Sequence, residues 1–302
     1  MSGSNPLQRR GLPLLLMAIV VSPGCHSVKS LSEAGYSLPY DPETGIVRGA
    51  EPIRIERDRT RACLLVHGWL SSPADFADLP KALDELGWDV HAPLHPGHGS
   101  RPADVEGVTA DTLLEQIRDE YSKLRGRYAE LVLIGASMGG AVSTILAAES
   151  APDRLVLIAP FYEVTYHWYY LIPLRWWAAL IPDFLLKPGP RAAMERVEVA
   201  AGVEGPLVYN AAPGSSLDLL FELRRRAVHD AEIERLTMPT LVIYSKSDDR
   251  ASPSAIEAFF ERLPAGPKTI VALPGSSHYL FHDSEGGEVI ETIKGFLGPP
   301  ER

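Results

Sequence analysis

A serine stands between glycines at the end of an apolar run in this 302-residue chain. Residues 131–140 read LVLIGASMGG, with Ser137 at the centre of a Gly-x-Ser-x-Gly pattern. In such a pattern the serine lies on a sharp turn from a strand to a helix, and its hydroxyl projects from the sheet. Gly135 and Gly139 are needed because side chains there would collide in so tight a turn. We therefore predict that Ser137 is a nucleophile.

A serine hydroxyl is a poor nucleophile at neutral pH, so Ser137 needs a base and the base needs an acid to orient it. After a strand-to-helix turn of this kind, the acid comes next along the chain and the histidine last. His278 lies in the first loop after the apolar run 268–274 and is the predicted base. His282 follows four residues later, where we expect the last helix to start.

Two adjacent aspartates are candidates for the acid. Asp248 and Asp249 both follow the apolar run that ends near Tyr244. Asp248 is preferred because it lies four residues after Tyr244 and five before Pro253. Asp249 remains the alternative, and Glu163 is a third, more remote choice.

Acyl transfer at a serine creates an oxyanion, which backbone N–H groups must stabilise. We expect one donor to be Met138, directly after the nucleophile, and the other to be Trp69 in LLVHGWLSS. His67 and His98 stand in His-Gly pairs and are expected to brace loops. The histidines of PLHPGHG lack an acid or cysteine at ligand spacing, so we predict no metal site.

Six apolar runs alternate with helical patterns, which predicts a mostly parallel sheet with helices on both faces. Ligand sites in such sheets collect beyond the carboxyl ends of the strands, where the residues named above fall. The strands are expected at 61–67, 88–93, 131–135, 154–160, 240–245 and 268–274. The helices are expected at 72–87, 109–125, from Met138 onward, 253–263 and 284–297.

Residues 161–235 interrupt this alternation and are predicted to form a helical cap inserted between two halves of the core, 60–160 and 236–298. The insertion begins with the aromatic stretch FYEVTYHWYYLIPLRWWAALIPDFLL and continues with a more polar helical stretch. The aromatic stretch would line an acyl pocket or rest on lipid, although ordinary packing against the sheet would account for it equally well.

The N-terminus has the features of a secretory signal over residues 1–24: a basic start, the apolar LPLLLMAIVV and the small residues SPG. A buried first helix is the alternative. Gly24 before Cys25 resembles the lipobox of bacterial lipoproteins, although Ser22 stands where that pattern usually has an aliphatic residue. The resemblance implies that Cys25 is lipidated and anchors a cell-envelope protein to a membrane, with residues 25–59 as a tether and leading segment.

The composition is that of a globular protein, with 45% hydrophobic and 23% charged residues. The formal net charge of −10 argues against nucleic acid as a partner. Of the two cysteines, Cys63 lies in the apolar ACLLVH, where we expect a buried, inert thiol.

From about residue 60 to 298 the chain resembles the α/β-hydrolase superfamily. Within it, HGW, PLHPGHGSRP, GASMGG, YSKSDD and SSHYLFHD are similar to the carboxylesterase and monoacylglycerol-lipase-like branch. The resemblance implies hydrolysis of acyl esters through an acyl-serine, a cap over the site and no cofactor. Carried onto this sequence, it implies Ser137 as nucleophile, Asp248 as acid, His278 as base, and Trp69 with Met138 as oxyanion donors.

The leading hypothesis is therefore a serine esterase acting on a small-molecule acyl ester, such as an acyl-glycerol or a lysolipid. Acyl transfer to an alcohol on the same residues is one alternative. A non-catalytic envelope lipoprotein that keeps the fold for binding is another. An activated serine reacts with a fluorophosphonate probe, and this reaction separates the enzymes from the binding protein.

Overall fold

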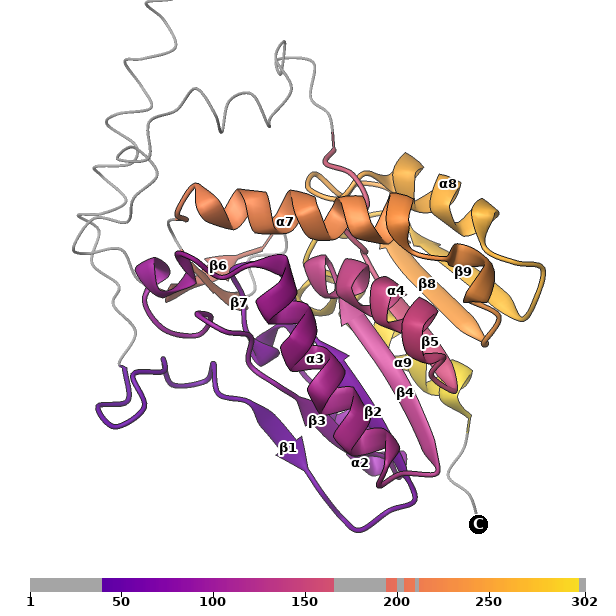
Figure 1. Cartoon of the computed structure of the whole chain (residues 1–302), viewed down its shortest axis with the longest axis horizontal. Coiled ribbons are helices and arrows are strands. Elements are labelled where there is room, and N and C mark those ends of the chain that lie inside the picture. Colours follow the sequence, from indigo (N-terminus) through magenta and orange to yellow (C-terminus); the bar gives the residue numbers. More distant parts are fainter. Residues whose placement is uncertain (1–39, 166–193, 200–203, 210–211, 299–302) are drawn as a thin grey trace, which may run out of the picture.

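The computed structural model describes residues 40–165, 194–199, 204–209 and 212–298 (Figure 1). The predicted signal, the lipidation site Cys25 and the aromatic stretch beyond Thr165 lie outside the described residues. Within the described part, no helix combines the length and apolar character needed to cross a membrane.

A seven-stranded sheet forms the centre of the described fold, in the order β1-β3-β2-β4-β5-β8-β9. Six of the strands run parallel, and β1 at the edge pairs antiparallel with β3. The predicted mostly parallel sheet is confirmed, with strand bounds close to those expected. The bounds are β1 Ile53–Ile55, β2 Arg61–Val66, β3 Asp89–Ala92, β4 Glu130–Ala136, β5 Arg154–Ile158, β8 Thr240–Ser245 and β9 Lys268–Leu273.

Helices cover both faces of the sheet, which explains why its central strands are apolar throughout. Every residue of β2 and of β8 is buried. One face packs against α3 (Ala110–Arg125), α4 (Met138–Ser150) and α8 (Pro253–Arg262). The other face packs against α2 (Leu79–Glu85) and α9 (Gly286–Leu297).

Helix α3 shows how the sequence pattern sets one of these layers. Leu113, Ile117 and Tyr121 recur at helical spacing and are buried against the sheet. The side chain of Thr109 accepts a hydrogen bond from the N–H of Thr112 at 3.1 Å and caps the N-terminus.

The single helix predicted over 72–87 is instead two elements, a 3-10 turn η2 (Pro73–Phe76) and helix α2. Ala77 separates them with a φ of 43°. A proline lacks the N–H that a helix interior requires, so Pro80 can only stand in a first turn. The break also lets Phe76 and Leu79 both become fully buried.

The inserted segment was predicted to be helical, and this is wrong for part of it. Strands β6 (Met194–Glu198) and β7 (Glu204–Tyr209) form a separate antiparallel pair. Leu207 and Tyr209 of β7 are buried whereas Val208 between them is half-buried, which is the alternation of a strand. The N–H of Tyr209 donates to the carbonyl of Leu70 at 3.0 Å, so this small sheet is joined to the loop after β2.

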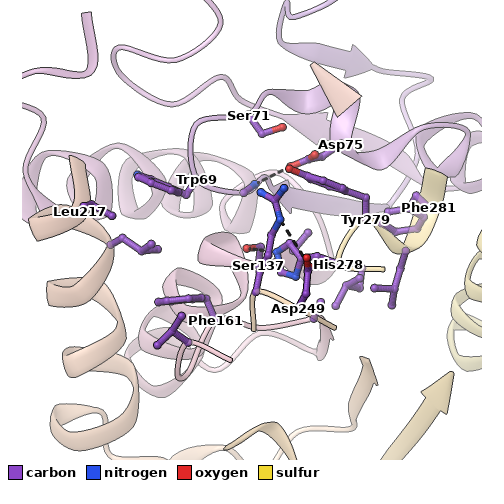
Figure 2. Close-up of a pocket in the computed structure, with 18 of the residues that line it drawn as sticks. Trp69, Ser71, Asp75, Ser137, Phe161, Leu217, Asp249, His278, Tyr279 and Phe281 are labelled. Atoms are coloured by element: carbon purple, nitrogen blue, oxygen red, sulfur yellow. Dashed lines mark hydrogen bonds and ion pairs between the residues drawn. The ribbon is translucent and has the colours of Figure 1, made fainter. Parts of the chain in front are cut away.

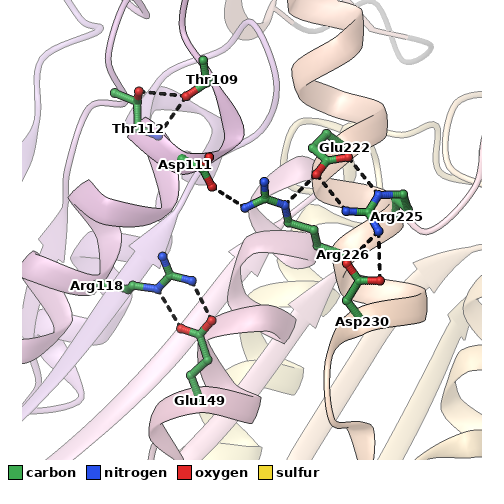
Figure 3. A network of polar contacts seen from close by, with 9 residues as sticks. All are labelled: Thr109, Asp111, Thr112, Arg118, Glu149, Glu222, Arg225, Arg226 and Asp230. Carbon is green, nitrogen blue, oxygen red and sulfur yellow. Dashed lines mark hydrogen bonds and ion pairs between the residues drawn. The ribbon is translucent and has the colours of Figure 1, made fainter.

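Helix α7 (Ser215–Arg225) supplies the predicted polar helical stretch and passes over the end of the sheet towards which β4 and β8 point (Figure 1). It continues as a π-helical turn, Arg226–Asp230. Ion pairs fasten this end to the core: Arg226 pairs with Asp111 of α3 at 2.5 Å (Figure 3). Beside it, Arg118 and Glu149 join α3 to α4 at 2.6 Å.

The predicted tether and leading segment, residues 25–59, is described from Tyr40 onward, and this part packs against the core. Residues 40–47 form a turn closed by a bridge between Tyr40 and Val47, and the N–H of Val47 donates to Gly99 at 2.7 Å. Val47 is fully buried, and β1 belongs to the main sheet. The apolar residues Ile53 and Ile55 pack against the core, which a polar tether would not do.

Candidate active site

Ser137 occupies the turn between β4 and α4 in a strained backbone conformation, with φ 53° and ψ −118°. A residue other than glycine keeps such a conformation only where its surroundings impose it. Its N–H donates to the carbonyl of Ile158 at 2.9 Å, and its carbonyl accepts from Gly140 and Phe161 at 2.9 Å each. These bonds to β5 and to α4 fix the serine at the carboxyl edge of the sheet.

The flanking glycines are required by the packing of this turn. A Cβ on Gly139 would lie 1.9 Å from the carbonyl oxygen of Val66, and one on Gly135 would lie 2.3 Å from that of Gly139. Neither distance is possible for a carbon atom in van der Waals contact, so the turn closes only with glycine at both positions. This packing agrees with the prediction from the sequence that side chains at these two positions would collide.

The structure brings together the predicted nucleophile, base and acid, Ser137, His278 and Asp248. Figure 2 shows the first two of them. His278 Nε2 lies 2.8 Å from Ser137 Oγ, and His278 Nδ1 lies 2.8 Å from Asp248 Oδ2. Because the carboxylate can only accept, the bonding pattern assigns the ring proton to Nδ1. Nε2 is then free to accept the proton of the Ser137 hydroxyl.

Burial distinguishes Asp248 from the alternatives to it. The Asp248 side chain is fully buried, whereas that of Asp249 is 66% exposed. Oδ1 of Asp248 accepts the N–H groups of Arg250 and Ala251 at 2.8 and 2.9 Å, which fixes the carboxylate. Glu163 pairs with Arg224 of α7 and does not hydrogen-bond to the histidine.

The two expected oxyanion donors flank the nucleophile. Met138 opens α4, and N–H groups in the first turn of a helix have no carbonyl partner within it. The loop after β2 passes on the other side, because a Cβ on Gly68 would lie 3.4 Å from Ser137 Cβ. Trp69 follows Gly68 and lines the cavity that opens at Ser137. Stabilisation of an oxyanion by Trp69 and Met138 stays a prediction.

His67 and His98 brace this loop. His67 Nε2 accepts the N–H of His95, and His98 Nε2 accepts the N–H of Leu70, at 3.1 and 3.2 Å. Burial lowers the pKa of His98 to about 4, so the ring is neutral and able to accept at neutral pH. Among the described residues, no three histidine, cysteine or acidic side chains are grouped as a metal site would require.

Asp75 is a site residue that the sequence did not indicate. Its Oδ2 accepts the N–H of Gly68 at 3.1 Å and so holds the loop that carries Trp69. Burial raises the pKa of Asp75. The residue lies in η2, which was predicted as an ordinary helix, and no motif marks it.

A cavity of about 250 Å³ opens above Ser137 and has two unlike sides. Figure 2 shows Trp69, Leu217 and Phe161 on one side of Ser137, and Asp75 with Tyr279 on the other. The apolar side comes from α7 and the segment after β5, and consists of Phe161, Val164, Leu217, Leu220 and Phe221. The more polar side includes Asp75 and Tyr279, with the apolar Phe281 beside them (Figure 2), and the Arg250 guanidinium lies over the Tyr279 ring. Ser71 and Asp249 also line the cavity.

A serine hydroxyl bonded to a histidine, which a buried carboxylate orients in turn, is arranged to attack an acyl carbon. At the carboxyl edge of a mostly parallel sheet, after a glycine-flanked turn, this is the arrangement of the α/β-hydrolases. The chain belongs to the Hydrolase_4 family, described as serine aminopeptidase S33, which matches residues 57–285.

Relatives at the sequence level carry the names of ester hydrolases. The chain is 26% identical over 253 residues to a thermostable monoacylglycerol lipase of Bacillus sp. (strain H-257), covering 82% of this chain and 93% of that protein. It is 23% identical over 247 residues to a carboxylesterase of Bacillus subtilis (strain 168), covering 78% and 92%.

Solved structures share the fold. The metagenome-derived lipolytic enzymes LipS and LipT provide a match with a TM-score of 0.72 at 23% identity, covering 83% of this chain and 98% of that one. The monoacylglycerol lipase of Paleococcus ferrophilus matches with a TM-score of 0.64 at 22% identity, covering 82% and 97%.

Proposed function

We propose that this serine ester hydrolase cleaves acyl-glycerol or lysolipid-like esters through an acyl intermediate on Ser137. The observation that carries the proposal is the chain of two 2.8 Å hydrogen bonds from Ser137 through His278 to Asp248. The family and the relatives named as a monoacylglycerol lipase and a carboxylesterase support an ester as the substrate.

In the proposed mechanism, His278 Nε2 takes the hydroxyl proton while Ser137 Oγ bonds to the acyl carbon. The carbonyl oxygen becomes an oxyanion and accepts hydrogen bonds from the N–H groups of Met138 and Trp69. As the intermediate collapses, the C–O bond to the alcohol breaks and His278 returns its proton to the leaving oxygen. Water then attacks the acyl carbon while His278 takes its proton. The bond to Ser137 Oγ breaks, His278 returns the proton to Oγ, and the carboxylic acid is released.

The apolar side of the cavity is the basis for proposing a substrate with an acyl chain of medium or greater length. Leu217 and Phe221 of α7, with Phe161 after β5, present apolar surface beside the nucleophile. Burial of one methylene group contributes about 0.8 kcal/mol, so chain length governs how tightly such a surface binds a substrate. The polar side of the cavity is then left for the alcohol.

A series of nitrophenyl esters from acetyl to palmitoyl tests the proposal, with monoacylglycerols of the same chains alongside. We expect kcat/KM to rise about threefold to fourfold for each added methylene until the apolar side is filled. Monoacylglycerols should be cleaved with the same chain preference. Turnover confined to aminoacyl nitroanilides, which the family description makes a necessary control, would contradict the proposal.

We also propose that lipid on Cys25 anchors the enzyme to a membrane of the bacterial cell envelope. The support is the sequence: a basic start, an apolar stretch and Gly24 before the cysteine. One acyl chain binds a membrane only marginally, whereas two attach a protein stably. A diacylglyceryl group on Cys25 meets that requirement.

Cys25→Ser is expected to move the enzyme from the membrane fraction to the soluble fraction, because the variant cannot carry the thioether-linked lipid. Fractionation with an esterase assay measures this, and mass spectrometry of the mature N-terminal peptide identifies the modification. Cys63→Ala is the matched control, since Cys63 is a buried free thiol that should not affect attachment. A soluble wild type, or an unmodified Cys25, would contradict the anchor while leaving the hydrolase untouched.

A further inference from the structure

One cation borders the catalytic cavity, and its side chain makes no hydrogen bond to another described residue. Arg250 is the single lysine or arginine among the described residues that line the cavity. Its nearest acidic atom is Asp249 Oδ1, 4.0 Å from Nε, which is the outer limit of an ion pair. Within the described part of the chain, neither terminal nitrogen of its side chain has a hydrogen-bond partner, which leaves both available to a ligand there.

Other arginines in the described part of the chain bind carboxylates or backbone carbonyls. Arg224 of α7 binds a carboxylate. Arg226 in the turn after α7 and Arg118 between α3 and α4 do the same (Figure 3). Of the described arginines, only Arg48 and Arg250 make no side-chain hydrogen bond. Arg48 lies on the exposed surface and does not border the catalytic cavity, so Arg250 alone combines a free guanidinium with a place at the active site.

The backbone and an aromatic ring fix the position of Arg250. Its N–H donates to Asp248 Oδ1 at 2.8 Å, and its carbonyl accepts from the N–H of Thr165 at 2.9 Å. Its guanidinium lies over the ring of Tyr279, 4.7 Å from the ring centre, which is a favourable cation–π distance. Tyr279 follows the catalytic histidine, so the cation is tied to both loops that carry the acid and the base.

The acidic side chains near Arg250 form no close ion pair with its guanidinium. Asp75 uses its Oδ2 to accept the N–H of Gly68, and no ion pair joins it to Arg250. Asp249 is 66% exposed and reaches Arg250 only at the limit of an ion pair. The Arg250 side chain is itself 53% exposed, so a hydrated anion can approach it without full dehydration.

We propose that Arg250 is the binding site for a phosphate group on the alcohol part of the ester substrate. The inference rests on the proposed ester hydrolase function and narrows it to acyl esters of a phosphorylated alcohol, such as an acyl glycerol phosphate. A guanidinium presents a planar fork of N–H donors that matches two oxygens of a phosphate. An uncharged glyceryl group would make no use of the charge.

The two sides of the cavity orient such a substrate. With the acyl chain against Phe161 and Leu217, the ester carbon lies at Ser137 and the alcohol extends toward Tyr279 (Figure 2), over whose ring Arg250 lies. The phosphate then meets the cation at the rim of the cavity, where water can reach it. The positive end of the α4 helix dipole adds to the attraction for an anion at this edge.

The test compares 1-decanoylglycerol with 1-decanoylglycerol 3-phosphate, which share the acyl chain and differ in the charged group. In the wild type, kcat/KM should favour the phosphorylated ester. In Arg250→Gln, the ratio of the two kcat/KM values should fall about 10- to 100-fold, mainly through KM, because a charge-assisted bidentate contact is lost. Arg250→Lys should restore part of the ratio, since it keeps the charge without the fork. Arg48→Gln, the matched control, should leave the ratio and both rates unchanged.

Free glycerol 3-phosphate gives a second readout. It should inhibit nitrophenyl ester hydrolysis competitively, with a Ki about 10-fold higher in Arg250→Gln than in the wild type, and the difference should shrink as salt is raised. An equal loss for both decanoyl esters, or an unchanged ratio in Arg250→Gln, would overturn the phosphate site. Either result would leave the hydrolase assignment intact. Ester cleavage that persists in Ser137→Ala would instead contradict the proposed function itself.

Discussion

Ser137→Ala is expected to lose nearly all esterase activity, by a factor on the order of a million in kcat. The hydroxyl is the group that His278 Nε2 contacts at 2.8 Å, and alanine offers no oxygen to bond to the acyl carbon. Measurement of kcat with the best nitrophenyl ester, together with labelling by a fluorophosphonate, checks the expectation. Both signals should disappear together.

Folding of this variant needs its own control because position 137 is strained. Alanine must adopt the same φ of 53°, and the three backbone hydrogen bonds that impose it do not involve the side chain. The thermal midpoint should therefore stay within a few degrees of the wild type. Ser143→Ala, at a buried serine of the same helix whose hydroxyl has no hydrogen-bond partner, should keep full activity. Near wild-type turnover in Ser137→Ala would show that a different nucleophile acts.

The elements around the nucleophile could be predicted because their determinants are local. An apolar run such as 131–135 can form only a buried element, and glycines on both sides of a serine restrict the turn that follows it. His278 and Asp248 lie directly after further apolar runs, and parallel strands place such residues at one edge of the sheet. The candidate triad therefore followed from the order of the elements.

The corrected elements depend on contacts that local patterns do not specify. Strands β6 and β7 become strands by pairing with each other and by the bond from Tyr209 to Leu70, a residue of the core. The segment around Ala77 turns because the fold buries Phe76 and Leu79 on either side of it. The composition of these segments favours a helix and indicates neither the strand pairing nor the turn at Ala77.

The same reasoning explains which site residues were missed. Asp75 is positioned by its bond to Gly68, seven residues earlier, and Arg250 by Tyr279 in another loop, and neither belongs to a recurring motif. Asp248 and Asp249 are adjacent in sequence and differ only in burial, so residue spacing could rank them without deciding between them. A substitution at each of the two aspartates makes that difference measurable.

Asp248→Asn is expected to lower kcat about ten-thousandfold, whereas Asp249→Asn should change it by less than about threefold. The N–H groups of Arg250 and Ala251 hold Oδ1 of Asp248, so the oxygen of an asparagine would remain there and its NH₂ would take the place of Oδ2. That NH₂ donates to His278 Nδ1 and forces the ring proton onto Nε2, which can then no longer accept from Ser137.

Turnover of a nitrophenyl ester by both variants, measured from pH 5 to 10, checks this expectation. Asp249→Asn is a matched control because it removes the same charge from the adjacent residue, whose side chain is exposed. The Asp248→Asn protein should retain its thermal midpoint within a few degrees, since asparagine fills the same buried volume. Because the ring proton would stand on Nε2 at every pH, raising the pH should not recover the lost activity. A severe loss in Asp249→Asn with a mild one in Asp248→Asn would contradict the geometry at His278 and transfer the acid to the exposed aspartate.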